Sequence, residues 1–209
     1  MSATKPYHRI GTVGRFKPLH NGGVALLEAL CDQAEEVIIG IGSCNKYDHR
    51  NPFTAEETKE MIDAFLKTSF SNYSFRFIPD YGHLPQYKDG QRWKDEIKVQ
   101  FGDIDLFVSG DQYVLKLLQD VYSVQESYLL VPEEKRIPCR GTHVRREMAK
   151  GDGWKPFVPL EVAKYLEEHK LIARFRKEFG LETIAEILQQ PDALHSENAE
   201  EEYRHVREG

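Results

Sequence analysis

The chain has 209 residues, 40% of them hydrophobic and 11% aromatic, so it can bury a substantial core as one domain plus a tail. Its formal net charge of −6 argues against a general binder of nucleic acids or anionic membranes. Three cysteines without a Cys-x-x-Cys pair indicate neither a disulfide framework nor a zinc site, and no apolar run approaches the length of a membrane span. We therefore expect a cytoplasmic protein that is neither secreted nor membrane-inserted, binds small molecules and has structural cysteines.

A glycine-containing turn near the start of the chain is its most informative local feature. A short apolar run, Ile10–Val13, predicts a strand, and Val24–Leu30 predicts a helix on the other side of the loop Gly14–Gly23. Such a turn directs the free N–H groups of the helix toward one spot, which attracts phosphate. Many α/β domains open in this way, so the turn alone does not establish phosphate binding. The loop also carries Arg15, Lys17 and His20.

Strand and helix patterns then alternate along the chain. Further strands are predicted at Glu35–Ser43, Tyr73–Pro79, Asp105–Gly110 and Ser127–Val131. Helices are predicted at 55–67, where Thr54 and Glu57 form a capping box, and at 93–101, 114–118, 143–150, 160–169 and from 174 onward. This alternation predicts an α/β fold, a doubly wound parallel five-stranded sheet with helices on both faces.

The C-terminal part differs in composition from the rest. We assign residues 1–172 to the α/β domain and 173–209 to a C-terminal helix followed by an acidic polar tail. The tail past Pro191 is expected either to be mobile or to pack on a partner subunit, which leaves a homo-oligomer open.

A second glycine-led helix start with basic residues occurs at Arg140–Arg146. Ligands of parallel sheets bind beyond the carboxyl ends of the strands, where the strand order reverses, so the two starts together indicate a nucleotide held from two sides. The cations available there are Arg15, Lys17, His20, Lys46, Arg50, Arg145 and Arg146. No Ser-His-Asp set, lone nucleophilic cysteine or close carboxylate pair stands out. We therefore expect catalysis by positioning and charge neutralisation, with Mg²⁺ arriving bound to a triphosphate and no metal site in the protein.

These segments resemble a known family. Gly14-Arg15-Phe16-Lys17-Pro18-Leu19-His20-Asn21-Gly22-Gly23 resembles the G-R-F-Q-P-x-H-x-G-H motif of the nucleotidylyltransferase superfamily, and archaeal-type nicotinamide-mononucleotide adenylyltransferases are the most similar group. Ile41-Gly42-Ser43 and Arg50-Asn51-Pro52-Phe53-Thr54-Ala55 resemble that group's G-S and N-P-F-T-A-G-E-R stretches. Gly141-Thr142-His143-Val144-Arg145-Arg146 is similar to I-S-G-T-x-I-R, and Val158-Pro159 to a V-P pair. The likeness covers about Ile10 to Leu171 and implies a Rossmann-like fold.

The resemblance also implies roles for individual residues. ATP is the implied substrate, with His20 and Arg145 as catalytic residues, and we add Lys17 as a third catalytic candidate that could replace a missing charge. The ATP side would be formed by Gly14, Arg15, Phe16, Gly22, Gly23, Gly141, Thr142 and Arg146. The mononucleotide side would be formed by Ser43, Arg50, Asn51, Pro52, Phe53 and Trp93, with Trp93 stacking on the nicotinamide ring.

Simpler roles compete with these assignments. His20 could cap a turn, Trp93 could belong to the core, and Arg145 and Arg146 could lie on a solvated helix face. Asp80 and Asp111 could orient a ribose hydroxyl, but we favour helix capping for both.

Four positions depart from the family pattern. This chain has Gly23 in place of the second histidine of H-x-G-H and Lys17 in place of the glutamine. It also has Arg140 in place of the serine before Gly-Thr, and Glu56-Glu57-Thr58 in place of G-E-R. The resemblance assigns that histidine to the charge on the transferring phosphate, and losing such a donor typically costs about 10² to 10³ in rate. Three explanations are open: a slow or inactive enzyme, an engineered position, or replacement by another cation. The candidate cations are Lys17, His143 and Arg140.

The expected activity is adenylyl transfer from ATP to nicotinamide or nicotinate mononucleotide with release of pyrophosphate. One alternative keeps the chemistry with another phosphorylated acceptor, such as a phosphopantetheine-like or sugar-phosphate molecule. Another is a nucleotide-binding sensor or scaffold without turnover, which Gly23 favours.

Overall fold

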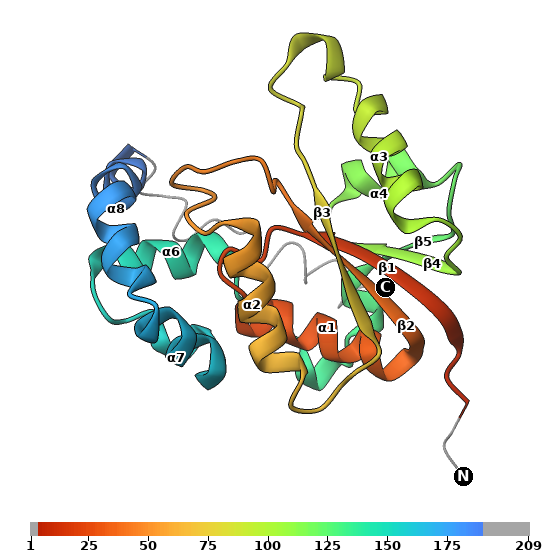
Figure 1. Ribbon diagram of the computed structural model, residues 1–209, viewed down its shortest axis with the longest axis horizontal. Helices are drawn as coiled ribbons and strands as arrows, with labels where there is room; N and C mark the ends of the chain where they lie inside the picture. The colour runs from red at the N-terminus through yellow and green to blue at the C-terminus, as the bar shows by residue number, and fades with distance from the viewer. Residues whose placement is uncertain (1–3, 190–209) are drawn as a thin grey trace.

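The structure is a computed structural model, and it describes residues 4–189. Its centre is a sheet of five parallel strands in the order β3-β2-β1-β4-β5 (Figure 1). The strands are β1 (Tyr7–Gly14), β2 (Ala34–Gly42), β3 (Tyr73–Ile78), β4 (Leu106–Ser109) and β5 (Val124–Glu126). The order reverses between β1 and β4, which opens a crevice at the carboxyl ends of these two strands. The predicted fold class is confirmed.

Helices cover both faces of this sheet. They are α1 (Asn21–Gln33), α2 (Ala55–Leu66), α3 (Gln91–Phe101), α4 (Gln112–Leu118), α5 (Ser127–Leu130), α6 (Gly141–Lys150), α7 (Leu160–Glu168) and α8 (Leu171–Gln189). Three short 3₁₀ turns, η1 (Pro85–Tyr87), η2 (Glu133–Lys135) and η3 (Lys155–Phe157), complete the described segments.

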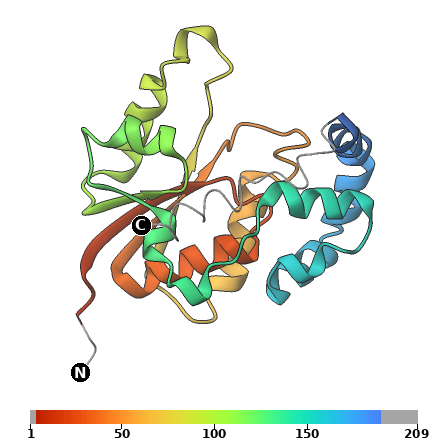
Figure 2. The same cartoon turned by 180° about the vertical axis from the view of Figure 1, so that it is seen from behind.

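The two faces of the sheet bury separate apolar clusters because neighbouring strand residues point in opposite directions. On β2, Ile39 and Ile41 pack with helices α1 and α2, whereas Ile38 packs with α3 and α4. Burial on both faces explains the nearly continuous apolar sequence of this strand. Figures 1 and 2 show α1 and α2 on one face and α3 and α4 on the other.

Helices α6, α7 and α8 form a stack at one end of the molecule, past α1 and α2 (Figure 2). Val144, Leu166 and Phe175, one from each helix, are buried in the same cluster as α1 and α2. The C-terminal helix, predicted from residue 174 onward, begins at Leu171, whereas the acidic tail past Pro191 lies outside the described residues.

One strand was predicted at the wrong place. Ser127–Val131 was expected to be the fifth strand, but β5 is the shorter Val124–Glu126, and Ser127–Leu130 forms a helical turn. Val131 packs with Ala25 and Ala29 of α1 instead of extending the sheet. A short apolar run is compatible with a buried helical turn as well as with a strand, so the hydrophobic pattern of Ser127–Val131 does not distinguish the two structures.

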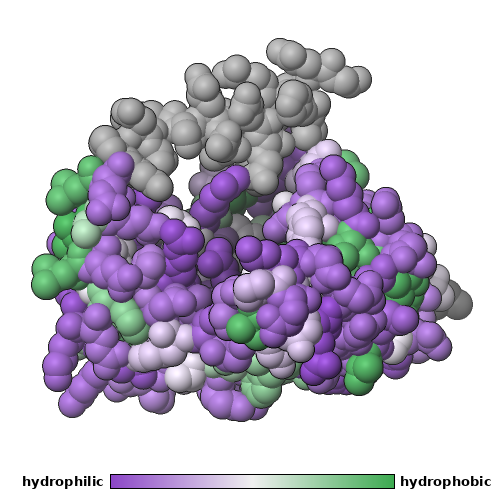
Figure 3. Space-filling model, turned by 90° about the horizontal axis from the view of Figure 1, so that it is seen from above, coloured by the Kyte–Doolittle hydropathy of each residue, from purple (hydrophilic) through white to green (hydrophobic). Residues whose placement is uncertain are grey.

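Hydrophilic residues dominate the face seen from above, the side toward which β3 runs (Figure 3). Within residues 4–189, no helix is both long and apolar enough to cross a bilayer.

Candidate functional site

The loop after β1 places His20 at the start of α1. His20 is the N-cap residue, and its Nδ1 accepts a hydrogen bond of 3.2 Å from the backbone N–H of Gly23. An acceptor role for Nδ1 puts the proton of the neutral ring on Nε2, which is then free to donate. The simpler capping role considered for His20 is therefore observed, and it leaves a donor for a ligand.

Gly22 brings the second glycine-led segment against this loop. A Cβ atom at Gly22 would lie 2.9 Å from the backbone carbonyl oxygens of both Ile137 and Cys139. Only glycine permits such a close approach of two backbones. The start of α1 and the segment that leads into α6 are therefore packed together, as a nucleotide site built from both requires.

Arg145 connects α6 to the loop after β1. Its Nη1 donates a hydrogen bond of 3.0 Å to the backbone carbonyl oxygen of Lys17, and its Nη2 donates one of 3.2 Å to Oγ1 of Thr142. A Cβ at Gly141 would lie 3.1 Å from Nη1 of Arg145 and 3.7 Å from Cδ2 of His20. The histidine, the guanidinium and the N-terminus of α6 therefore meet at one place.

Arg145 and Arg146 are both buried, with 6% and 7% of their surface exposed. The simpler expectation of a solvated helix face is therefore wrong for both. The Nε atom of Arg146 has no hydrogen-bond partner within residues 4–189. A buried guanidinium with unused donor capacity is suited to an anionic ligand.

Lys17 also turns inward, at 1% exposure. Its peptide bond to Pro18 is cis, and its Nζ donates a hydrogen bond of 2.9 Å to the backbone carbonyl oxygen of Ser43, just past β2. The ammonium group is therefore held between the carboxyl ends of β1 and β2.

Burial changes the proton affinities of these groups. Desolvation lowers the pKa of His20 to about 4, with a further contribution from Arg145, so the ring is neutral near pH 7. Desolvation lowers the pKa of Lys17 to about 8 against the opposing influence of Cys44 and Asp48. Desolvation and the nearby Arg15 lower the pKa of Arg145 to about 10. The site thus combines a neutral histidine donor with two cations whose pKa values are lowered mainly by burial.

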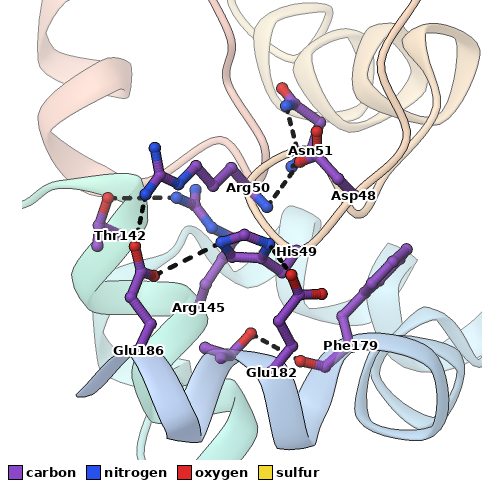
Figure 4. Close-up of polar contacts among 10 residues, drawn as sticks. Asp48, His49, Arg50, Asn51, Thr142, Arg145, Phe179, Glu182 and Glu186 are labelled. Carbon is purple, nitrogen blue, oxygen red and sulfur yellow. Dashed lines mark hydrogen bonds and ion pairs between the residues drawn. The ribbon is translucent and has the colours of Figure 1, made fainter. Parts of the chain in front are cut away.

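The segment after β2 is only partly directed toward this site. Asn51 is buried, and its Nδ2 donates to Oδ1 of Asp48 at 2.9 Å, while its Oδ1 has no partner within the described chain. Phe53 is fully buried in the core, and the carbonyl oxygen of Pro52 accepts a hydrogen bond from Arg174. Of this segment, Arg50 is the exposed cation, and it is paired with Glu186 of α8 (Figure 4).

A cavity of about 500 Å³ lies at the carboxyl ends of β1 and β4. Its lining includes Gly14, Arg15, Ser43 and Trp93, all predicted as site residues. Trp93 also packs against the apolar cluster under α3 and α4, so it belongs both to the core and to the cavity wall. Phe16 lies beside this cavity, and its ring lies 2.7 Å from the position that a Cβ at Gly14 would occupy.

The sequence did not single out several cavity residues. They are Tyr81, Tyr87, Lys88, Tyr113, Val114 and Leu117. Their position in or just after the loops that follow β3 and β4 could have identified them, because such loops surround the ligand in parallel sheets. Asp111 caps α4 by accepting a 2.9 Å hydrogen bond from the N–H of Tyr113, and Asp80 accepts one of 2.8 Å from Gly82. Both carboxylates also line the cavity.

Gly23 is the position where the family pattern has a second histidine. It is buried at the first turn of α1, and a Cβ there would lie 3.2 Å from Cδ1 of Leu19. Of the candidate replacements, Lys17 lies within the cation cluster, whereas the ring of His143 packs edge-on against Phe157 at a centroid distance of 4.5 Å.

This arrangement is suited to holding a polyphosphate beside the cavity that Trp93 lines. It offers two helix N-termini, the Nε2 donor of His20 and the cations of Lys17 and Arg145. Among residues 4–189, no group of three or more His, Cys, Asp or Glu side chains is placed to hold a metal ion.

Comparisons with known proteins agree with this geometry. Residues 12–147 match the family described as cytidylyltransferase-like. The nicotinamide-nucleotide adenylyltransferase of Thermococcus onnurineus is 31% identical over 182 residues, covering 86% of this chain and 93% of the relative. That of Pyrococcus furiosus is 32% identical over 185 residues, covering 86% and 94%.

A solved structure shares the fold. It is a bifunctional NMN adenylyltransferase/ADP ribose pyrophosphatase from Francisella tularensis, with a TM-score of 0.68 and 19% identity. The match covers 91% of this chain and 57% of that longer chain.

Proposed function

The chain belongs to the cytidylyltransferase-like family, and from this premise we propose that it transfers the adenylyl group of ATP to the phosphate of nicotinamide or nicotinate mononucleotide. The observation that carries the proposal is the hydrogen bond from Arg145 to the Lys17 carbonyl, which joins the two glycine-led segments beside a cavity. Relatives about 31% identical over most of the chain are named for this reaction. ATP and the mononucleotide are the substrates, and Mg²⁺ arrives bound to the triphosphate.

The chemistry requires no general base. A phosphate oxygen of the mononucleotide is already ionised near neutral pH, and it attacks the α-phosphorus of ATP. The bond from that phosphorus to the bridging oxygen of the β-phosphate breaks, and pyrophosphate leaves with the electron pair. Catalysis then depends on alignment of the two phosphates and neutralisation of the charge that moves toward the leaving group.

The residues of the site can be assigned to these tasks. We assign the Nε2–H of His20 and the N-termini of α1 and α6 to the ATP phosphates, since all three present donors there. Arg145 and Thr142 would bind the leaving β and γ phosphates. Lys17 would supply the charge that a histidine at position 23 provides in the family pattern, and Trp93 would stack on the base of the mononucleotide inside the cavity.

The direct test is incubation with ATP, Mg²⁺ and nicotinamide or nicotinate mononucleotide. Wild-type protein should release pyrophosphate and form a dinucleotide, and His20→Ala should lose most of this activity. A panel that adds a phosphopantetheine-like and a sugar-phosphate acceptor tests the alternative in which the acceptor differs. If no acceptor yields pyrophosphate above the His20→Ala level, the enzymatic proposal fails.

Gly23 supports a second candidate function. Without the second histidine, the same site could bind nucleotide as a sensor or scaffold and turn over nothing. Calorimetry with ATP separates the two, because tight binding in the absence of pyrophosphate release is the outcome that the sensor predicts.

Two further expectations belong to this proposal. We propose a cytoplasmic location, which fits the three free cysteines of the described chain. We also propose a homo-oligomer, which gel filtration with light scattering would test.

A further inference from the structure

Helix α8 is fixed over the segment that follows β2. Arg174 donates to both carboxylate oxygens of Glu57, at 2.5 and 2.6 Å, and to the carbonyl oxygen of Pro52 at 3.2 Å. Phe175 is fully buried and packs near Phe53, with ring centroids 6.5 Å apart. The beginning of α8 is thus anchored at the N-terminus of α2.

Farther along, α8 presents an acidic row to this segment. The row consists of Glu178, Glu182 and Glu186, which are four residues apart and therefore share one helix face. Each member binds a side chain of the loop between β2 and α2. Glu178 accepts a hydrogen bond from the Tyr47 hydroxyl, Glu182 lies 2.9 Å from Nδ1 of His49, and Glu186 lies 2.8 Å from Nη2 of Arg50 (Figure 4).

Glu186 is the member that reaches the phosphate-binding cations. Its other carboxylate oxygen lies 3.8 Å from Nε2 of His49, so it is held from two sides, and its side chain is only 22% exposed. Figure 4 shows its carboxylate between the side chains of Arg50 and His49. Its negative charge also acts on Arg145, whose pKa it raises against the larger effect of burial.

Although the resemblance places Arg50 on the mononucleotide side, its charge adds to the effect of burial in lowering the pKa of Arg145. Arg50 thus belongs to the positive region around the residue assigned to the ATP phosphates. The carboxylate of Glu186, which pairs with Arg50, and the phosphates of ATP therefore draw on the same positive groups. A carboxylate that stays among these cations repels a triphosphate, and one that leaves must give up its bond to Arg50. The Arg50 side chain is 59% exposed, and exposed ion pairs are weak, so a triphosphate can displace this one.

We propose that Glu186 is an internal anion that competes with the ATP phosphates for Arg50, so that α8 lowers the affinity of the site for ATP. This inference rests on the proposed nucleotide site and adds a residue that controls how strongly that site binds. The sequence alone does not reveal it, because 136 positions separate Arg50 from Glu186.

The test is calorimetric titration of the full chain with Mg²⁺ and ATP, without an acceptor. Glu186→Gln keeps the size of the side chain and removes its charge, and it should tighten ATP binding by about two- to fivefold. Glu182→Gln is the matched control, because it removes the same charge one helical turn away. Glu182 contacts His49 and not Arg50. This control should change the dissociation constant by less than Glu186→Gln does, because Glu182 makes no ion pair with Arg50.

A double-mutant cycle identifies the partner. In an Arg50→Gln background, Glu186→Gln should lose most of its effect on ATP binding. Unchanged or weaker ATP binding by Glu186→Gln would overturn the inference, and weaker binding would show that Glu186 positions Arg50 for the ligand. The measurement is binding, so the two proposals can fail separately. ATP binding without adenylyl transfer would refute only the proposed reaction. If neither the wild type nor Glu186→Gln bound ATP, both proposals would fail.

Discussion

The Nζ atom of Lys17 donates a hydrogen bond of 2.9 Å to the backbone carbonyl oxygen of Ser43. This bond joins the loops that follow β1 and β2, the two neighbouring strands whose carboxyl ends border the site. It uses one of the three protons of the ammonium group and leaves the others for a phosphate. A lysine at this position can therefore fix the loop and neutralise a ligand at the same time.

The titration of Lys17 predicts a pH limit for the reaction. Burial lowers its pKa to about 8, so the group loses its charge as the pH rises through that value. We expect kcat/KM for ATP to fall above pH 8, by about tenfold for each further pH unit. Lys17→Arg keeps the charge throughout and should remove this alkaline limb, although its larger head group lowers the maximal rate. An unchanged alkaline limb in Lys17→Arg would exclude Lys17 as its source.

Replacement of Arg145 tests the connection between α6 and the loop after β1. Arg145→Gln removes the donor to the Lys17 carbonyl and a cation from the phosphate site. We expect kcat/KM to fall by about 10² to 10³, and the free energy of unfolding to fall by about 1 to 3 kcal/mol because a buried carbonyl loses its partner. Steady-state kinetics and urea unfolding measure the two effects.

The control for Arg145 lies on the same helix. Lys150 pairs with Glu147 at the exposed end of α6. Lys150→Gln should change the unfolding free energy by less than about 0.5 kcal/mol and leave the kinetics unchanged. Equal losses in the two variants would mean that α6 responds to any loss of charge.

The sequence predicted the fold and the two glycine-led segments because both depend on local patterns. Apolar runs located four of the five strands, and glycine next to basic residues located the starts of α1 and α6. Phe53 was expected at the mononucleotide side, but it is buried in the core near Phe175, a contact that only tertiary packing determines. The pairing of Arg50 with Glu186 has the same origin, since no local pattern encodes which helix packs over which loop.

The depressed pKa of His20 makes a prediction about stability. Burial lowers this pKa to about 4, below the ordinary value of 6.5, so the unfolded chain binds a proton more readily between these pH values. The contribution of His20 to the free energy of unfolding is complete above pH 6.5 and should decline by up to about 3 kcal/mol as the pH falls to 4. Urea unfolding of wild type and His20→Asn at several pH values isolates this contribution as a difference between the two proteins.

His8 provides the control for this measurement. It pairs with Glu35 at a site where its side chain is 72% exposed, so His8→Asn should leave most of the decline in place. If the difference between wild type and His20→Asn stayed constant from pH 6.5 to pH 4, the ring would not be the buried neutral group that we describe.

Substitutions at position 23 test whether the site lacks only one hydrogen-bond donor. A Cβ at Gly23 meets Cδ1 of Leu19 at 3.2 Å, a contact that the tip of a flexible side chain can relieve by moving a few tenths of an ångström. Gly23→Ala should therefore fold normally, because the better helix propensity of alanine, worth about 0.5 to 1 kcal/mol, offsets the crowding.

Gly23→His adds an imidazole beside His20 and should raise kcat by about 10-fold or more if the remaining phosphate contacts are in place. With Gly23→Ala as the steric control, a gain confined to the histidine variant would show a site ready for transfer chemistry. Equal activity of both variants and the wild type would indicate that Lys17 already meets the need for charge.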